Sequence, residues 1–333
     1  MRIAIVGAGS WGTTMGLVTA PNGPVSLWAR RPELAEAIKA GTNPDYLDGI
    51  SLPPLQASAD LAEALDGAEA VLVAVPSHGL RTVMEEAADL IDHDVPVLSL
   101  TKGLEQGTNL RMTEVLAEAL PGHDRRRIGV LSGPNLAREI AMGEPAATVI
   151  ALRDHGVAAD LQAAIMTPLF RVYTNNDVIG SELAGAAKNV MAIAAGMVHG
   201  LGFGLNTMAA MVTRALAEVT RLGVAMGGSP LTFGGLAGIG DLMATCLSDL
   251  SRNHRVGAEL GKGRNIDDIV AEMSMVAEGV KTTGPVLELA GRLGVEMPIA
   301  AEVGRVLDGG SPHESVVRLM GREAKAEGHG IVG

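Results

Sequence analysis

The sequence contains little cysteine, few aromatic residues and no excess of basic charge. Of 333 residues, only Cys246 is a cysteine, 2% are aromatic, and 26 Lys and Arg stand against 38 Asp and Glu. A single thiol excludes an internal disulfide and fits a reducing compartment, which indicates the cytoplasm. A net charge of -12 argues against nucleic acid or an anionic membrane as the main partner, because both attract basic surfaces.

Long apolar runs and an amino-terminal targeting pattern are also missing. The stretch of small residues over 183–205 is interrupted by Lys188, Asn189 and His199, and the chain opens on a strand pattern rather than on a signal sequence. We therefore expect neither secretion nor a membrane span. Because 47% of the residues are hydrophobic, the chain can fill two hydrophobic cores, which predicts two domains.

Short β-rich runs alternate with helical patterns through the first half of the chain. This alternation predicts an α/β Rossmann-like fold, a doubly wound parallel sheet with helices on both faces, followed by an all-α domain. We expect a dinucleotide-binding domain over residues 1–180, a helical substrate domain over 181–325 and a frayed tail over 326–333. The predicted strands cover residues 2–6, 25–28, 70–75, 95–100, 128–131, 147–152 and 170–174.

A glycine triplet follows the first predicted strand. Gly7 permits a tight turn, Gly9 lets the backbone approach a pyrophosphate, and Gly12 allows a helix to pack closely on the strand. Ser10 and Trp11 open that helix, whose free N–H groups face the phosphates. Glycine triplets also arise by chance in a chain with 43 glycines, but the strand-to-helix context predicts a bound dinucleotide.

The second predicted strand ends at two arginines, Arg30 and Arg31, about where the adenosine ribose of a dinucleotide lies. An NAD-selective site usually places a carboxylate there, whereas guanidinium groups can pair with a 2′-phosphate. This predicts a preference for NADP. Glu33 lies close enough to leave NAD use open, and both arginines could instead be solvated charges at the start of a helix.

Two later strands run into loops that suit a ligand, because ligands bind at the carboxyl ends of strands in open α/β sheets. Lys102 follows the strand at 95–100 and can place an ammonium group there, although a loop lysine is often only solvated. The strand at 128–131 leads into Gly133, Asn135 and Ala137, a turn whose amide groups can receive an anion or a nicotinamide amide.

Lys188 lies in a helical pattern of small residues at the start of the second half. Its neighbours three and four positions away carry no opposite charge, so nothing on its own helix pairs with it. We expect its amine to lie in a cleft and to transfer a proton there. The alternative is a tightly packed helix from which Lys188 reaches solvent.

Further candidates follow in the helical half. Asp241 is typical of a helix N-cap by its position alone, whereas Ser251, Arg252 and Asn253 group a hydroxyl, a guanidinium and an amide that suit a phosphate monoester. Alternatively, Ser251, Arg252 and Asn253 form an exposed polar turn without a ligand. Glu278 could accept hydrogen bonds from a cofactor or be an ordinary surface residue. No metal is expected.

These residues together resemble the bacterial and archaeal type of NAD(P)-dependent glycerol-3-phosphate dehydrogenase over nearly the whole chain. The shared motifs are Gly7-Ala8-Gly9-Ser10-Trp11-Gly12-Thr13, Leu27-Trp28-Ala29-Arg30, Val73-Ala74-Val75-Pro76-Ser77, Thr101-Lys102-Gly103-Leu104-Glu105, Ser132-Gly133-Pro134, Lys188-Asn189, Gly235-Leu236-Ala237-Gly238-Ile239-Gly240-Asp241-Leu242, Ser251-Arg252-Asn253 and Glu278-Gly279. Asn135-Leu136 departs from the common Ser-Phe, which bears on the side-chain contact at residue 135.

The resemblance implies reversible reduction of dihydroxyacetone phosphate to sn-glycerol 3-phosphate between a Rossmann domain and a helical domain, and supply of glycerophospholipid precursor. Lys188 falls at the proton acceptor's position, and Lys102 and Asp241 complete the catalytic set. The substrate positions are Lys102, Gly133, Asn135, Lys188, Asp241, Ser251, Arg252 and Asn253. Beside Gly7, Gly9 and Gly12, the cofactor positions are Ser10, Trp11, Arg30, Arg31, Lys102, Ala137, Arg252, Val276 and Glu278.

Three other interpretations stay open from the residues. A β-hydroxyacid or 6-phosphogluconate dehydrogenase shares the two-domain plan but does not predict Asp241 together with Arg252. A dinucleotide sensor without catalysis needs only the first domain. The long apolar helices also predict an oligomerisation surface, most simply in a homodimer.

Overall fold

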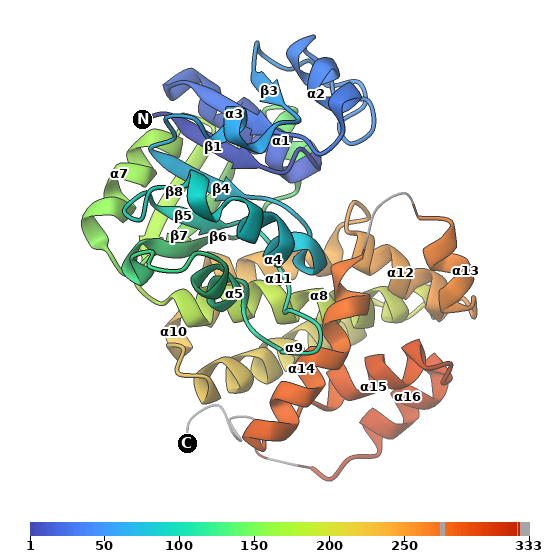
Figure 1. Cartoon of the computed structure of the whole chain (residues 1–333). Coiled ribbons are helices and arrows are strands. Elements are labelled where there is room, and N and C mark those ends of the chain that lie inside the picture. The colour runs from blue at the N-terminus through green and yellow to red at the C-terminus, as the bar shows by residue number, and fades with distance from the viewer. Residues whose placement is uncertain (274–276, 325, 327–333) are drawn as a thin grey trace. The chain divides into compact units, whose positions relative to one another are not determined.

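The computed structural model describes residues 1–273, 277–324 and 326 (Figure 1). The chain forms two compact units. The N-terminal unit consists of Met1–Thr101 and Met112–Val178, and the C-terminal unit of Lys102–Arg111 and Ile179–Gly333. We expected residues 102–111 to belong to the first domain. The structure places them with the second, because Lys102 and Arg111 form ion pairs with Asp241 and Glu182 of that unit.

The N-terminal unit is built on one eight-stranded sheet in the order β3-β2-β1-β4-β5-β6-β7-β8. All seven predicted strands are confirmed, with ends that differ by at most two residues. The strands are β1 (Ile3–Val6), β2 (Val25–Trp28), β3 (Gln56–Ser58), β4 (Ala70–Val73), β5 (Val97–Ser99), β6 (Ile128–Ser132), β7 (Ala146–Ala151) and β8 (Phe170–Asn175).

The predicted parallel sheet contains one antiparallel pairing. β1 to β6 are parallel, but β7 pairs antiparallel with β6, and β8 is parallel to β7. The connection from β6 to β7 holds only α6 (Ala137–Ala141). A five-residue helix rises about 7.5 Å, less than the roughly 17 Å of a five-residue strand, so it does not return the chain to the start of β6. The unpredicted β3 is three residues long and lacks an apolar run.

Helices cover both faces of the sheet. Along β4, Leu72 packs in one core with Met15 of α1 and Leu161 of α7, whereas the buried side chains of Val71 and Val73 alternate to the opposite face. This burial on both faces is typical of a doubly wound sheet. Besides α6, the helices are α1 (Ser10–Thr19), α2 (Pro32–Lys39), α3 (Leu61–Leu65), α4 (Ser77–Glu86), α5 (Met112–Ala119) and α7 (His155–Ile165).

From residue 178 onward, the described part of the chain forms helices and loops and contains no strand. The central element of the C-terminal unit is α8 (Val178–Gly200), which is buried without a break from Gly180 to Val198. A helix buried on all sides lies in the middle of a core. The others are α9 (Leu205–Ala225), α10 (Pro230–Phe233), the π-helical turn η4 (Leu236–Gly240), α11 (Asp241–Leu247), α12 (Arg252–Gly261), α13 (Ile266–Ala271), α14 (Glu278–Leu293), α15 (Pro298–Leu307) and α16 (Pro312–Met320).

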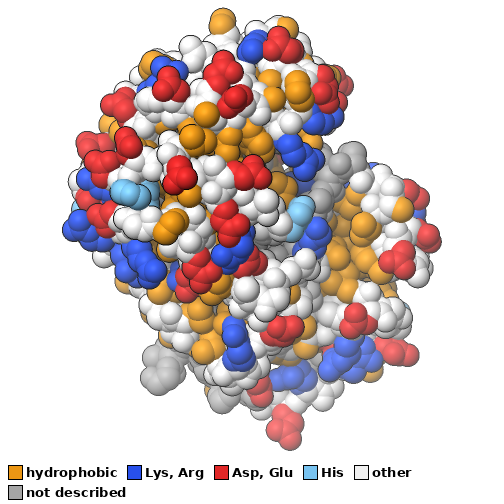
Figure 2. Space-filling view, in the orientation of Figure 1, with side chains coloured by type: hydrophobic (Ala, Val, Ile, Leu, Met, Phe, Trp, Pro, Cys, Tyr) orange, Lys and Arg blue, Asp and Glu red, His pale blue; other side chains and the backbone are white. Residues whose placement is uncertain are grey.

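None of the described helices combines the length and apolarity needed to cross a bilayer. On the face drawn in Figure 2, acidic and basic side chains are interspersed among apolar and uncharged groups. This face therefore offers no continuous basic strip for a polyanion.

A buried carboxylate joins two helices of the C-terminal unit. Glu218 of α9 accepts hydrogen bonds from the backbone N–H groups of Ile299 and Ala300, at 2.8 and 3.3 Å, and so caps the start of α15. The side chain is 2% exposed. Burial raises the pKa of Glu218 to about 7, although the two N–H groups oppose the shift. Glu218 therefore holds its proton in the folded state over a pH range in which the unfolded chain has lost it.

Glu218→Gln should flatten the pH dependence of stability. Because the folded pKa lies above the unfolded value, wild-type stability falls as pH rises from about 4.5 to 7. The loss from this group amounts to about 3 kcal/mol. Urea unfolding at pH 4.5 to 8 measures it, with exposed Glu86→Gln as the control that keeps the wild-type slope. An unchanged slope in Glu218→Gln would contradict the assignment.

Candidate functional site

The glycine-rich loop between β1 and α1 has the geometry of a pyrophosphate cradle. Gly7 has φ +116°, which disfavours any residue with a Cβ. A Cβ added at Gly12 would overlap the carbonyl oxygen of Gly7, so the helix can approach the strand only with glycine there. Gly9 is the N-cap of α1, whose first turn carries no acidic residue. The helix N-terminus can therefore receive an anion.

Two buried polar side chains, Thr13 and Asn43, hold this loop, and the sequence analysis missed Asn43. Asn43 donates hydrogen bonds to the carbonyl of Ala8, at 3.1 Å, and to the hydroxyl of Thr13, at 2.8 Å. Thr13 in turn bonds to the carbonyl of Ala8, at 3.2 Å. Asn43 lies 35 positions from Ala8, in a loop after α2, and nothing in the local sequence marks it.

The residues around the loop fit a dinucleotide. The indole N–H of Trp11 is buried and has no hydrogen-bond partner among the residues described, so a ligand group could accept from it. At the end of β2, Arg31 pairs with the carboxylates of Asp45 and Glu33, whereas the exposed Arg30 has no hydrogen bond or ion pair within the described chain. Of the two arginines, Arg30 thus has the guanidinium that is not committed to another side chain.

The turn after β6 holds three more candidates in the N-terminal unit. Gly133 has φ +149°, and Asn135 donates to the hydroxyl of Thr148 at 3.0 Å. The other amide atom of Asn135, Oδ1, is buried without a partner in the part of the chain described. The carbonyl of Ala137 accepts from Thr14 of α1, at 3.1 Å, which ties the two helices together.

The C-terminal unit gathers two lysines around one aspartate. Lys188 of α8 contacts Asp241 Oδ1 at 2.6 Å and donates a hydrogen bond to Thr245 of α11. Lys102 contacts the other carboxylate oxygen, Oδ2, at 2.7 Å. Lys188 is 5% exposed and Asp241 1%. The alternative in which Lys188 reaches solvent is therefore wrong, and its counter-charge comes from a residue 53 positions away.

The N-cap interpretation of Asp241 is also wrong. Gly240 is the N-cap of α11, and Asp241 is the first residue inside the helix. The π-helical turn η4 precedes it, and a Cβ added at Gly238 would overlap the backbone of Phe233. This close turn directs the carboxylate toward the lysines instead of toward its own helix.

The surroundings of Lys102 make its ammonium group a better proton donor than that of an exposed lysine. Burial lowers the pKa of Lys102 to about 8; the Asp241 carboxylate opposes that shift and the Lys188 ammonium adds to it. The two ammonium groups share one carboxylate and repel each other, so Lys102 gives up a proton more readily than an isolated lysine. The cluster can stabilise an oxyanion and exchange a proton with it.

A chain of amides links this cluster to α12. Asn189 donates to the carbonyl of Lys102, and Asn253 donates to Asn189, each at 3.0 Å. The Oδ1 of Asn253 accepts from the backbone N–H of Gly279 at 2.9 Å, at the start of α14. A Cβ added at Gly279 would overlap the carbonyl of Asn189. The network therefore fixes the loop that carries Lys102 against three helices.

Of the three residues predicted to bind a phosphate, Ser251 and Asn253 are buried and Arg252 is exposed. Ser251 caps α12 by accepting from the N–H of His254, at 3.2 Å, and Asn253 is buried in the amide chain. Arg252 is exposed at the first position of α12, and Glu278 opens α14. Val276 lies outside the described residues. An anion would thus meet the guanidinium of Arg252 and backbone N–H groups rather than the side chains of Ser251 and Asn253.

Paired glycines bring α12 onto α8. Gly196 and Gly200 on α8 face Gly257 and Gly261 on α12 so closely that a Cβ at any of the four would overlap backbone of the facing helix. The packing fixes the start of α12 relative to the helix that carries Lys188.

Comparisons with known proteins identify the family of the chain. Residues 2–158 match the model for the NAD-dependent glycerol-3-phosphate dehydrogenase N-terminus, and residues 177–318 match that for the C-terminus. A glycerol-3-phosphate dehydrogenase [NAD(P)+] from Sphingopyxis alaskensis is 55% identical, covering 93% of this chain and 92% of its own, and one from Mycobacterium avium is 49% identical, covering 100% and 97%.

A solved structure shows the same fold. The glycerol-3-phosphate dehydrogenase of Coxiella burnetii superposes with a TM-score of 0.90 at 38% identity, over 96% of this chain and 99% of that one. These matches span both units, so they exclude the hydroxyacid dehydrogenase and the sensor as descriptions of the whole chain. The chain therefore belongs to the family of NAD-dependent glycerol-3-phosphate dehydrogenases, which are oxidoreductases that use NAD(P) and act on a CH–OH group.

Proposed function

We propose that this chain reduces dihydroxyacetone phosphate reversibly to sn-glycerol 3-phosphate, with Lys188 as the proton donor and acceptor and NADPH as the preferred reductant. The observation that carries the proposal is the buried Lys188 ammonium, 2.6 Å from Asp241 and beside a second cation, Lys102. The product would serve as a glycerophospholipid precursor.

The cluster would act on the C2 oxygen of the substrate. The nicotinamide nucleotide, when bound, supplies the hydride that C2 receives. Lys188 stabilises the negative charge that develops on the carbonyl oxygen and gives that oxygen its proton, so the ketone becomes an alcohol. In the reverse direction, neutral Lys188 takes the hydroxyl proton. Asp241 holds Lys188 in place, and Lys102 contributes positive charge next to the same oxygen.

Phosphate recognition would fall to the start of α12. Arg252 is exposed there, and no acidic residue lies in the first turn of the helix. A guanidinium and a helix N-terminus both favour a phosphate dianion. Binding energy from this remote group would hold C2 in position for reduction.

Initial-rate assays test the reaction. We expect NADPH oxidation with dihydroxyacetone phosphate, and kcat/KM at least about 100-fold lower with unphosphorylated dihydroxyacetone, because the phosphate contacts are lost. Small hydroxyacids with NADP+ should give no turnover. Equal rates with and without the phosphate would contradict the assignment of α12.

Arg30→Ala tests the cofactor preference. Arg30 is uncommitted in the structure, and charge-assisted hydrogen bonds to a 2′-phosphate contribute about 1.5–3 kcal/mol. We expect kcat/KM for NADPH to fall about 10- to 100-fold, with little change for NADH. Arg31→Ala is the matched control, because Arg31 already pairs with Asp45 and Glu33. A loss of the same size for both nucleotides would point to folding rather than selectivity.

A homodimer and a cytoplasmic location stay predictions from the sequence.

A further inference from the structure

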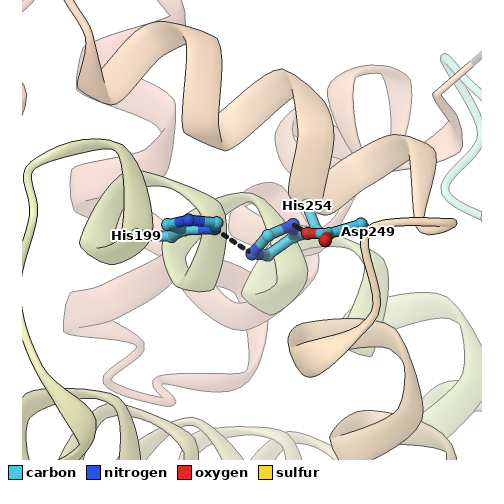
Figure 3. A group of neighbouring side chains, drawn as sticks. All are labelled: His199, Asp249 and His254. Carbon is cyan, nitrogen blue, oxygen red and sulfur yellow. Dashed lines mark hydrogen bonds and ion pairs between the residues drawn. The ribbon is translucent and has the colours of Figure 1, made fainter.

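Two histidines and an aspartate meet in the C-terminal unit, outside the cluster of Lys102, Lys188 and Asp241 (Figure 3). His199 lies in the last turn of α8, His254 in the first turn of α12, and Asp249 in the loop between α11 and α12. One ligand atom from each lies within 4.8 Å of the other two. Within the described residues, no other three His, Cys, Asp or Glu side chains approach one another in this way.

The spacing of the two imidazoles suits a shared cation. His199 Nδ1 and His254 Nε2 are 3.4 Å apart. This separation is that of a long hydrogen bond, beyond the roughly 2.7–3.2 Å that N–H···O bonds usually span. Two nitrogens bound to one tetrahedral ion at about 2.05 Å lie about 3.3–3.4 Å apart. The ring planes tilt by 34° with centroids 5.2 Å apart, so the edges rather than the faces of the rings meet.

Asp249 adds the negative charge. Its Oδ1 lies 3.9 Å from His254 Nδ1, the ring nitrogen that does not face His199, so the exposed Asp249 side chain has to rotate toward Nε2 to share an ion with both rings (Figure 3). His254 is 4% exposed, whereas His199 and Asp249 are exposed. An ion can therefore arrive from solvent and meet one ligand that is already fixed by packing and two that can adjust by rotation.

We propose that His199, His254 and Asp249 form a binding site for a divalent transition-metal ion of the Zn²⁺ class, with water completing the coordination. Two imidazoles and one carboxylate suit Zn²⁺, Co²⁺ or Ni²⁺, whereas Mg²⁺ prefers oxygen ligands only. The ion would join the end of α8 to the start of α12. Because Asp249 lies two residues before Ser251, it would also fix the loop that leads into α12.

Metal titration of the chelator-treated full chain tests the site. At pH 7.5 we expect calorimetry with ZnCl₂ to give one equivalent, CoCl₂ to develop visible d–d absorption at the same stoichiometry, and MgCl₂ to give no signal. Zn²⁺ at 100 times its Kd should raise Tm by about 5 °C. His199→Ala should weaken Zn²⁺ binding at least tenfold, and Asp249→Asn should weaken it less.

The control is His313→Ala, because His313 is exposed on α16 outside the cluster. It should bind Zn²⁺ like the wild type. His199 is exposed, so its replacement is expected to fold, and an unchanged urea midpoint checks this. Unchanged affinity in His199→Ala, or binding that does not saturate near one equivalent, would overturn the proposal and leave a histidine pair without a metal. Since the readout is binding, the result is independent of the proposed reaction.

Discussion

Lys188→Met is expected to lower kcat for dihydroxyacetone phosphate reduction about 1,000-fold, within the 10²–10⁴ range typical of general acid–base groups. Methionine keeps the length and packing of the side chain but has no proton to give. Nucleotide binding should change little, because the glycine-rich loop belongs to the N-terminal unit. Steady-state rates and fluorescence titration with NADPH measure the two effects separately.

Lys188→Arg separates charge from proton transfer. Arginine keeps the positive charge beside Asp241 but does not lose a proton in the working pH range. If Lys188 acts through its proton, Lys188→Arg should be nearly as impaired as Lys188→Met. Lys262→Met is the matched control, because Lys262 is exposed and pairs with Glu259 at the end of α12. Turnover within tenfold of the wild type in Lys188→Met would reject the assignment.

The fold was largely predictable because its signals are local. Short β-rich runs of four to six residues predicted seven of the eight strands, and the turn at Gly7 and Gly12 was predicted from its position between a strand and a helix. β3 escaped prediction because a short edge strand needs no apolar pattern. The reversal of β7 depends on the length of α6, which periodicity does not give.

The residues of the Lys102, Lys188 and Asp241 cluster were named from the sequence, but the contacts between them were not predictable. Asp241 lies 139 positions from Lys102 and 53 from Lys188, and no local pattern states which charges meet. Asn253 was expected to face a phosphate, but its side-chain amide donates a hydrogen bond to Asn189 and accepts one from the backbone N–H of Gly279. Long-range hydrogen bonds of this kind are set by how helices pack, here by the glycines between α8 and α12.

Asp241→Asn should damage both stability and activity, because one carboxylate compensates the buried ammonium group of Lys188 and the half-buried one of Lys102. Removing one member of a buried ion pair costs about 3–5 kcal/mol. We expect a loss of that size in the free energy of unfolding at pH 7, measured by urea titration. Asp45→Asn is the control, since its ion pair with Arg31 is exposed and its loss should change the free energy of unfolding little.

The pH dependence of this loss distinguishes uncompensated charge from lost packing. Asp241 opposes the lowering of the Lys102 pKa, so without it that pKa falls below its wild-type value of about 8. A lysine whose folded pKa lies below its unfolded value costs stability at low pH, and the cost disappears as pH rises toward 10.5. Asp241→Asn should therefore be less destabilised, relative to the wild type, at pH 9.5 than at pH 7.

A second substitution completes the argument. Lys102→Met in the Asp241→Asn background removes one of the two repelling cations, so it should recover part of the lost stability at pH 7. It should not recover turnover, because Lys188 still lacks the carboxylate that positions it. If the double variant is no more stable than Asp241→Asn at either pH, charge repulsion between the lysines is not what Asp241 relieves, and its role in the cluster would have to be one of packing.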